Sequence, residues 1–191
     1  MHGTGTGHPV EQPAPGAGAH GRRAYALLDG IGGDQDIQSW TRTAARRLAR
    51  AAARAGALDG LREIHAARAA ELAEEGWRAR DMPMAVAVVA VAEPGKPLEV
   101  AWCGDARAYV LPPSGGQIQR LTTDHNMRQV LLDLGHEPGP YARNRVTSYL
   151  GDTSPDAPIG SVTVPTAAGW CWPVTEPTSR WRTPNWPSPT T

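Results

Sequence analysis

The stretch Leu27-Leu28-Asp29-Gly30-Ile31-Gly32-Gly33 places a carboxylate and three glycines directly after a short apolar run. A strand that ends on an aspartate holds the carboxylate on a rigid element, and glycines let a ligand approach the backbone closely. Such a corner suits a divalent metal ion or a phosphate group. An Asp-Gly pair after a strand is also a common turn, so this pattern alone leaves both interpretations open.

The residues around this corner predict the elements that position it. Residues 24–28 form a strand, residues 30–36 form a loop, and Ser39 is a suitable N-cap for a helix that ends at Gly56. The core-facing positions of this helix recur at helical spacing and are Trp40, Ala44, Leu48, Ala51 and Ala55. The carboxylate therefore lies at a junction between a strand and an amphipathic helix.

A second amphipathic helix is predicted over residues 59–75, with Gly76 as its stop. Leu58, Leu61, Ile64 and Leu72 face the core, whereas Glu63, Arg68, Glu71 and Glu74 face water. His65 has no potential metal ligand at a useful offset and is interpreted as a surface or boundary histidine.

After Pro83 the hydrophobic period changes from helical to strand-like. Residues 85–91 are a continuous run of small and β-branched side chains, which is typical of a central strand buried on both faces. Further strands are predicted at 98–102, after the Gly104-Asp105 turn, at 117–121 and at 159–164. This order favours an α+β fold, a sandwich of antiparallel sheets flanked by helices, over a βαβ fold.

One helix interrupts these strands. Thr123 or Asp124 is the predicted cap, and Gly135 is the predicted end of the helix. Its expected core-facing residues are Met127, Val130, Leu131 and Leu134.

Composition excludes several classes of protein. The 191 residues suffice for one domain, and the 19 basic and 19 acidic residues give no net charge, which argues against a nucleic-acid or membrane-surface protein. The first helix is locally basic, and its arginines are interpreted as a solvated face: Arg42, Arg46, Arg47, Arg50 and Arg54. Two cysteines form no disulfide framework, and the longest apolar run, residues 84–92, is too short to cross a bilayer. We therefore expect a cytoplasmic protein.

Several motifs stand in one order along the chain: LLDGIGG, AWCGDARAYVL, LTTDHN and NRVTSYLGD. Together they resemble the PPM family of metal-dependent protein serine/threonine phosphatases, over roughly residues 23–164. The resemblance implies an αββα sandwich that holds two Mg²⁺ or Mn²⁺ ions between its sheets. A water shared by two such ions hydrolyses phosphoserine or phosphothreonine, so a phosphoprotein is the implied substrate.

The same resemblance assigns roles to individual residues. It implies that the Asp29 carboxylate bridges the two ions, that the Gly30 carbonyl binds one of them, and that Asp105 helps to hold an additional, weaker metal. Oxygen ligands of this kind suit Mg²⁺ and Mn²⁺. Asp124 and His125 are interpreted as mainly structural, fixing a junction between strand and helix.

The sequence departs from the family pattern in several places. Residues 1–21 are rich in Gly and Pro, contain Glu11 as their only acid, and are interpreted as a flexible arm without the family's N-terminal arginine and acidic segment. Met82-Pro83-Met84 replaces a usual Gly-Thr-Thr. The later Ser-Asp-Gly and Gly-x-x-Asp-Asn motifs, which supply the remaining metal carboxylates, are missing. Residues 22–165 are therefore a partial phosphatase domain, and the C-terminal part of the sandwich is incomplete.

Residues 166–191 form a tail of foreign composition, because four of the seven tryptophans fall there among prolines and threonines. We expect no packed element in this tail. Gly169-Trp170-Cys171-Trp172-Pro173 is encoded by GGN TGG TGY TGG CCN. When this stretch is read from the third base of the first codon, the codons become NTG, GTG, YTG and GCC, which encode an apolar residue followed by Val-Leu-Ala. The next shifted codons permit Ser-Asp-Gly, which is the missing motif. We therefore hypothesise a frameshift between about residues 164 and 169.

Two functions follow from these observations. The first is a serine/threonine phosphatase-like protein that is impaired or inactive, because Asp29 and Gly30 alone cannot supply the six oxygens that each ion prefers. The alternative is a noncatalytic pseudophosphatase remnant that acts as a binding module. A phosphate-binding glycine loop on an unrelated fold is disfavoured, because the distal motifs would then be coincidental.

Overall fold

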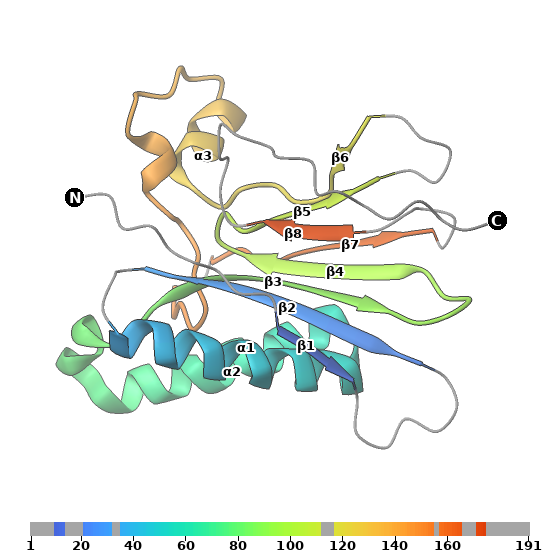
Figure 1. The fold of residues 1–191 in the computed structure, drawn as a ribbon. Helices are drawn as coiled ribbons and strands as arrows, with labels where there is room; N and C mark the ends of the chain where they lie inside the picture. Colours follow the sequence, from blue (N-terminus) through green and yellow to red (C-terminus); the bar gives the residue numbers. More distant parts are fainter. Residues whose placement is uncertain are drawn as a thin grey trace.

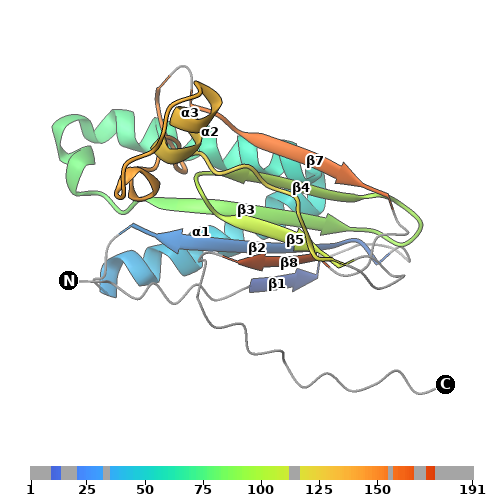
Figure 2. The same ribbon diagram turned by 90° about the horizontal axis from the view of Figure 1, so that it is seen from above.

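The computed structural model describes residues 10–13, 21–31, 35–111, 117–154, 157–165 and 171–174. Within these ranges the chain forms two antiparallel sheets with helices packed on them (Figure 1). Helices α1 (Gln35–Ala55) and α2 (Ala57–Glu75) cover the outer face of the larger sheet, and the smaller sheet lies over its inner face (Figures 1 and 2). The predicted α+β sandwich is confirmed.

The larger sheet has the strand order β1-β2-β3-β4-β7, and all neighbours are antiparallel. Its strands are β1 (Val10–Pro13), β2 (Arg23–Gly30), β3 (Ala85–Ala92), β4 (Leu98–Cys103) and β7 (Gly160–Val164). The smaller sheet has the order β6-β5-β8, with β6 (Gln119–Arg120), β5 (Arg107–Val110) and β8 (Cys171–Val174). The run of small and β-branched residues in β3 is buried on both faces, as its pattern predicts.

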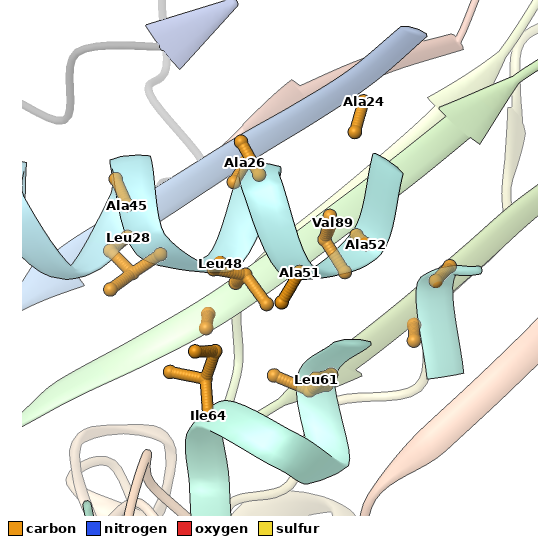
Figure 3. Close-up of a cluster of buried hydrophobic side chains, with 14 of the residues drawn as sticks. Ala24, Ala26, Leu28, Ala45, Leu48, Ala51, Ala52, Leu61, Ile64 and Val89 are labelled. Carbon is orange, nitrogen blue, oxygen red and sulfur yellow. The ribbon is translucent and has the colours of Figure 1, made fainter. Parts of the chain in front are cut away.

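Two hydrophobic clusters hold these layers together. The first lies between the helices and the larger sheet, where Leu48 and Leu61 meet Leu28 and Val89 among many alanines (Figure 3). Small side chains bring the two helices very close, since a Cβ on Gly60 would lie 2.5 Å from the Ala52 backbone. The second cluster fills the space between the two sheets.

The predicted start of the first helix is wrong. Helix α1 begins at Gln35, and Ser39 lies inside it, where its carbonyl accepts a hydrogen bond from the Thr43 hydroxyl at 3.1 Å. The acidic Asp36 in the first turn favours this earlier start, because a negative charge there is stabilised by the helix dipole. The predicted core position Ala55 is exposed at the end of the helix.

The helix near residue 127 also differs from the prediction. Asn126, rather than Thr123 or Asp124, caps α3 (Met127–Asp133) by accepting a hydrogen bond from the Gln129 amide at 3.0 Å. None of its residues is buried, and Leu134 just beyond it is 66% exposed. Met127 and Leu131 are half-buried, and the 3₁₀ helix at Ala142–Asn144 contacts α3. Val130 and Leu134 are exposed, so helical periodicity overestimated the burial of this face.

Short strands occur in both terminal segments. Strand β1 lies within the predicted flexible arm, and β8 lies within the tail for which no packed element was expected. Residues 1–9, 14–20, 166–170 and 175–191 of these segments lie outside the described part of the chain. Strand β6 has two residues where five were predicted. The described residues also form two short 3₁₀ helices, Gly76–Asp81 and Ala142–Asn144. In the described ranges, no helix is long and apolar enough to cross a bilayer.

Candidate metal centre

Asp29 lies at the end of β2, where it pairs with Val86 of β3. Side chains alternate between the two faces of a strand, so Asp29 shares a face with Leu27. Both Leu27 and Val86 belong to the cluster between the sheets. The structure therefore directs the predicted metal ligand toward the space between the two sheets, where it is half-buried.

Gly30 follows at the point where the chain leaves the sheet and enters α1. A Cβ on Gly30 would lie 2.6 Å from Ile37 Cγ2 and 2.8 Å from the Thr41 hydroxyl. A side chain at this position would force the first turns of α1 away from the strand. The glycine of the Asp-Gly pair is thus required by the packing of helix on strand.

The turn at Gly104-Asp105 is distant from Asp29 in the sequence but lies at the same end of β2 and β3. Gly104 has a φ of +82°, and its Cβ would lie 2.1 Å from Val86 Cγ1. This turn therefore packs against the side chain that lies opposite Asp29 in the sheet. The fold brings the predicted ligands Asp29, Gly30 and the Gly104-Asp105 turn to one end of β2 and β3.

Asp105 is held in a polar network. Burial raises the pKa of its carboxyl group above the ordinary value, and the nearby Asp124 carboxylate raises it further. Hydrogen bonding to the Asn126 side chain and the charge of Arg107 act in the opposite direction. Asp105 thus already interacts with protein groups at the junction that leads into α3.

Asp124 links two strands of the smaller sheet. Its carboxylate accepts a hydrogen bond from Arg107 Nε at 2.9 Å and forms ion pairs with both Arg107 and Arg120. The Trp102 indole donates a hydrogen bond to the Thr123 carbonyl at 2.8 Å. These contacts give Asp124 the structural role that the sequence predicted.

His125 is also part of this junction. Its ring stacks on Trp102 with centroids 6.0 Å apart, and its backbone amide donates to the Gly104 carbonyl at 3.0 Å. Burial lowers the pKa of the imidazole, against the opposing effect of the Asp124 charge. The LTTDHN motif, residues 121–126, therefore connects the Gly104-Asp105 turn to the start of α3.

The donor set does not fit a two-ion centre. Within the described ranges, no group of three or more His, Cys, Asp or Glu side chains is arranged to hold a metal ion. Asp29 and the Gly30 carbonyl would supply two of the six oxygens that one Mg²⁺ prefers. Glu11 is the only acid among residues 1–21, and the later carboxylate motifs are missing from the sequence.

Arg68 has a role that hydrophobic periodicity did not predict. It was expected to face water, but it is 4% exposed and its guanidinium lies 4.6 Å from the centroid of the Trp40 ring. It donates hydrogen bonds to the Pro83 carbonyl at 2.7 Å and to the Glu71 carboxylate at 3.0 Å. A long side chain can bury its stem and still pair its charged head, which the spacing of apolar residues does not register. Arg68 thus joins both helices to the segment that enters β3.

Comparisons with known proteins agree with this fold. The sequence pattern of the protein phosphatase 2C family matches residues 6–130. A search of curated proteins finds no match.

Three solved bacterial structures show the similarity of fold. The Stage II Sporulation E family protein from Thermanaerovibrio acidaminovorans is 24% identical, with a TM-score of 0.62 over 83% of this chain and 74% of that one. The serine/threonine phosphatase of S. agalactiae is 16% identical, with a TM-score of 0.65 over 86% and 70%. The Mycobacterium tuberculosis phosphatase PstP/Ppp is 18% identical, with a TM-score of 0.56 over 85% and 74%. Because the family pattern covers well over half of the sequence and the order of motifs and strands agrees with it, this chain belongs to the protein phosphatase 2C family.

Proposed function

We propose that this chain is a phosphatase-like member of the family that lacks the metal-dependent reaction. The main support for this proposal is the small number of metal-ligating side chains at the candidate centre. Asp29 and the Gly104-Asp105 turn meet at one end of the sheets. Among the described residues, no third metal-ligating side chain joins them. Two ions that share one water need several bridging and terminal carboxylates.

Direct metal binding and turnover test this proposal together. The purified full chain is mixed with Mn²⁺ or Mg²⁺, and release of phosphate from p-nitrophenyl phosphate and from a phosphoserine peptide is measured. We expect no turnover above the metal alone, and no saturable Mn²⁺ binding by calorimetry. A cooperative thermal transition in the same sample shows that the absence of turnover does not come from unfolding.

Two variants make the result decisive. Asp29→Asn removes the predicted bridging carboxylate, whereas Asp59→Asn removes a carboxylate that is 71% exposed on α2 and serves as the matched control. Turnover that is lost in Asp29→Asn and kept in Asp59→Asn would show that the chain is an active metal-dependent phosphatase.

The alternative function is that of a noncatalytic binding module. Such a module needs a folded sandwich but no metal centre, and two hydrophobic clusters hold the layers of this sandwich together. We propose that a phosphoprotein, the partner implied by the resemblance, is bound rather than hydrolysed. A cytoplasmic location stays a prediction from the sequence.

We also propose that residues 22–165 are a partial catalytic domain and that a shifted frame encodes its continuation. Strand β8 occupies Cys171–Val174, close to the codons that spell Val-Leu-Ala in the shifted frame. The nucleotide sequence from codon 164 onward tests this. We expect an open shifted frame that encodes Ser-Asp-Gly and a later Asp-Asn motif, and an early stop codon in that frame would overturn the proposal.

A further inference from the structure

The outward face of α1 carries a concentrated positive charge. Five arginines lie on it, and all of them are exposed: Arg42, Arg46, Arg47, Arg50 and Arg54. Thr43 lies between them and Ser39 just before them, and the only acid of the helix, Asp36, lies in its first turn. Because the whole chain has no net charge, this face is a local feature of the fold rather than a result of basic composition.

Acids of α2 neutralise one flank of this face. Glu71 of α2 lies 3.4 Å from Arg47, and Glu63 lies 2.7 Å from Arg54. On the other flank, Arg42 Nε donates to the Gln38 carbonyl at 3.3 Å. For the part of the chain that the structure describes, no ion pair is shown for Arg42 or Arg46. The outward face therefore keeps a net positive charge.

A hollow lies beside this face, between α1 and α2. Ala44, Ile64, Leu150 and Trp40 form the apolar part of its lining. Glu71 and Arg68 also line it, and the Glu71 carboxylate is paired there with Arg47 and Arg68. Thr43 and Arg47 belong both to this hollow and to the outward face of α1. A chain lying along the arginines could thus place one apolar side chain in the hollow.

The spacing of the arginines along α1 matches the spacing of alternate side chains in an extended peptide. Arg42, Arg46 and Arg50 follow one another at four-residue intervals, which is a rise of about 6 Å per step in an α-helix. Alternate residues of an extended peptide are about 6.6–6.8 Å apart. Carboxylates at every second position of an extended segment therefore match this row of guanidinium groups.

We propose that the outward face of α1 and the adjoining hollow form a docking surface for an acidic, extended peptide segment that carries one apolar side chain. Opposite charges on the two partners provide the complementarity, and the hollow provides an anchor. The face has no large apolar side chains for insertion into a lipid surface, which favours a protein segment over a membrane. This inference does not depend on whether the chain hydrolyses phosphoesters.

Fluorescence anisotropy with the full-length chain tests the proposal. The probe is a labelled peptide with glutamate at alternate positions and one central leucine, measured at low and at physiological salt. We expect saturable binding that weakens with salt, and a weaker interaction when serine replaces the leucine. Replacing Arg42, Arg46 and Arg50 together with glutamine is expected to weaken binding about tenfold, since each exposed ion pair contributes a few-fold.

The matched control is Arg62→Gln, which removes an arginine from the outward face of α2 whose side chain is 62% exposed. This variant is expected to bind as the unchanged chain does. Equal weakening by both sets of substitutions would show a general charge effect and overturn the proposal. No saturable binding of the peptide would also overturn it. Arginine-dependent binding to phosphatidylserine vesicles that exceeds binding to the peptide would replace the peptide with a membrane partner.

Discussion

Replacing Arg68 with alanine is expected to lower the free energy of unfolding by about 2–4 kcal/mol, close to the cost of breaking a buried charged contact. The substitution removes two stem methylenes, each contributing about 0.8 kcal/mol when buried. It also removes a cation–π contact with Trp40 and a charged hydrogen bond to the Pro83 carbonyl, contributing about 0.5–2 and about 1.5–3 kcal/mol. Release of the guanidinium from burial offsets part of this loss.

The ion pair with Glu71 adds little to that value. The Glu71 side chain is 41% exposed, so solvent screens its interaction with Arg68. We therefore expect Glu71→Gln to cost less than about 1 kcal/mol. Arg68→Met keeps the stem against Trp40 and loses the polar contacts, so its stability should lie between those of the alanine variant and the unchanged chain.

Urea unfolding followed by far-UV circular dichroism measures these differences. For a domain of this size, about 3 kcal/mol corresponds to a fall of about 6–12 °C in Tm. The exposed Arg62 serves again as the control, because Arg62→Ala removes an arginine from the same helix without a buried contact. If Arg68→Ala costs no more than Arg62→Ala, Arg68 contributes only as a surface residue and its buried contacts add no measurable stability.

Three further predictions follow from burial and backbone geometry. Cys103 is buried and burial raises its pKa to about 12, so a disulfide reagent such as DTNB should modify it only after denaturant is added. Gly104→Ala should destabilise the fold strongly, because the residue has a positive φ and the new methyl group would meet Val86; a shift of the urea midpoint measures this. Burial lowers the pKa of His65 and His125 below the ordinary value of 6.5, so the unfolded chain binds more protons just below that pH. Stability should therefore fall as pH decreases from 7 toward 5, and His65→Gln should flatten this dependence; an unchanged slope would count against the histidine.

The elements around the candidate centre were largely predictable because their signals are local. An apolar run before Asp29, glycines at helix ends and a continuous β-branched run each report the conformation of a few adjacent residues. For this reason β2, β3, α2 and the Gly104-Asp105 turn occur close to their predicted places. The motifs also follow one another in a fixed order, and that order suffices to indicate the family.

Burial of polar side chains was not predictable in the same way. Arg68 follows helical spacing for a water-facing residue, yet its partners come from Trp40 of another helix and from the Pro83 carbonyl. Val130 and Leu134 follow the spacing of a core-facing helix, yet they are 39% and 66% exposed. Whether such a residue is buried depends on which distant element covers it.

By itself, the sequence determined the fold class, the order of the elements and the Asp29-Gly30 corner, because each depends on the types and spacing of neighbouring residues. Only the tertiary structure decided what that corner contains. The register between β2 and β3 places Val86 opposite Asp29, and Gly104 packs on the same valine. Metal binding needs several carboxylates in one small volume, and their distances are set by contacts between remote segments. Those contacts bring the Asp-Gly corner and the Gly104-Asp105 turn together, and among the described residues they assemble no third ligand.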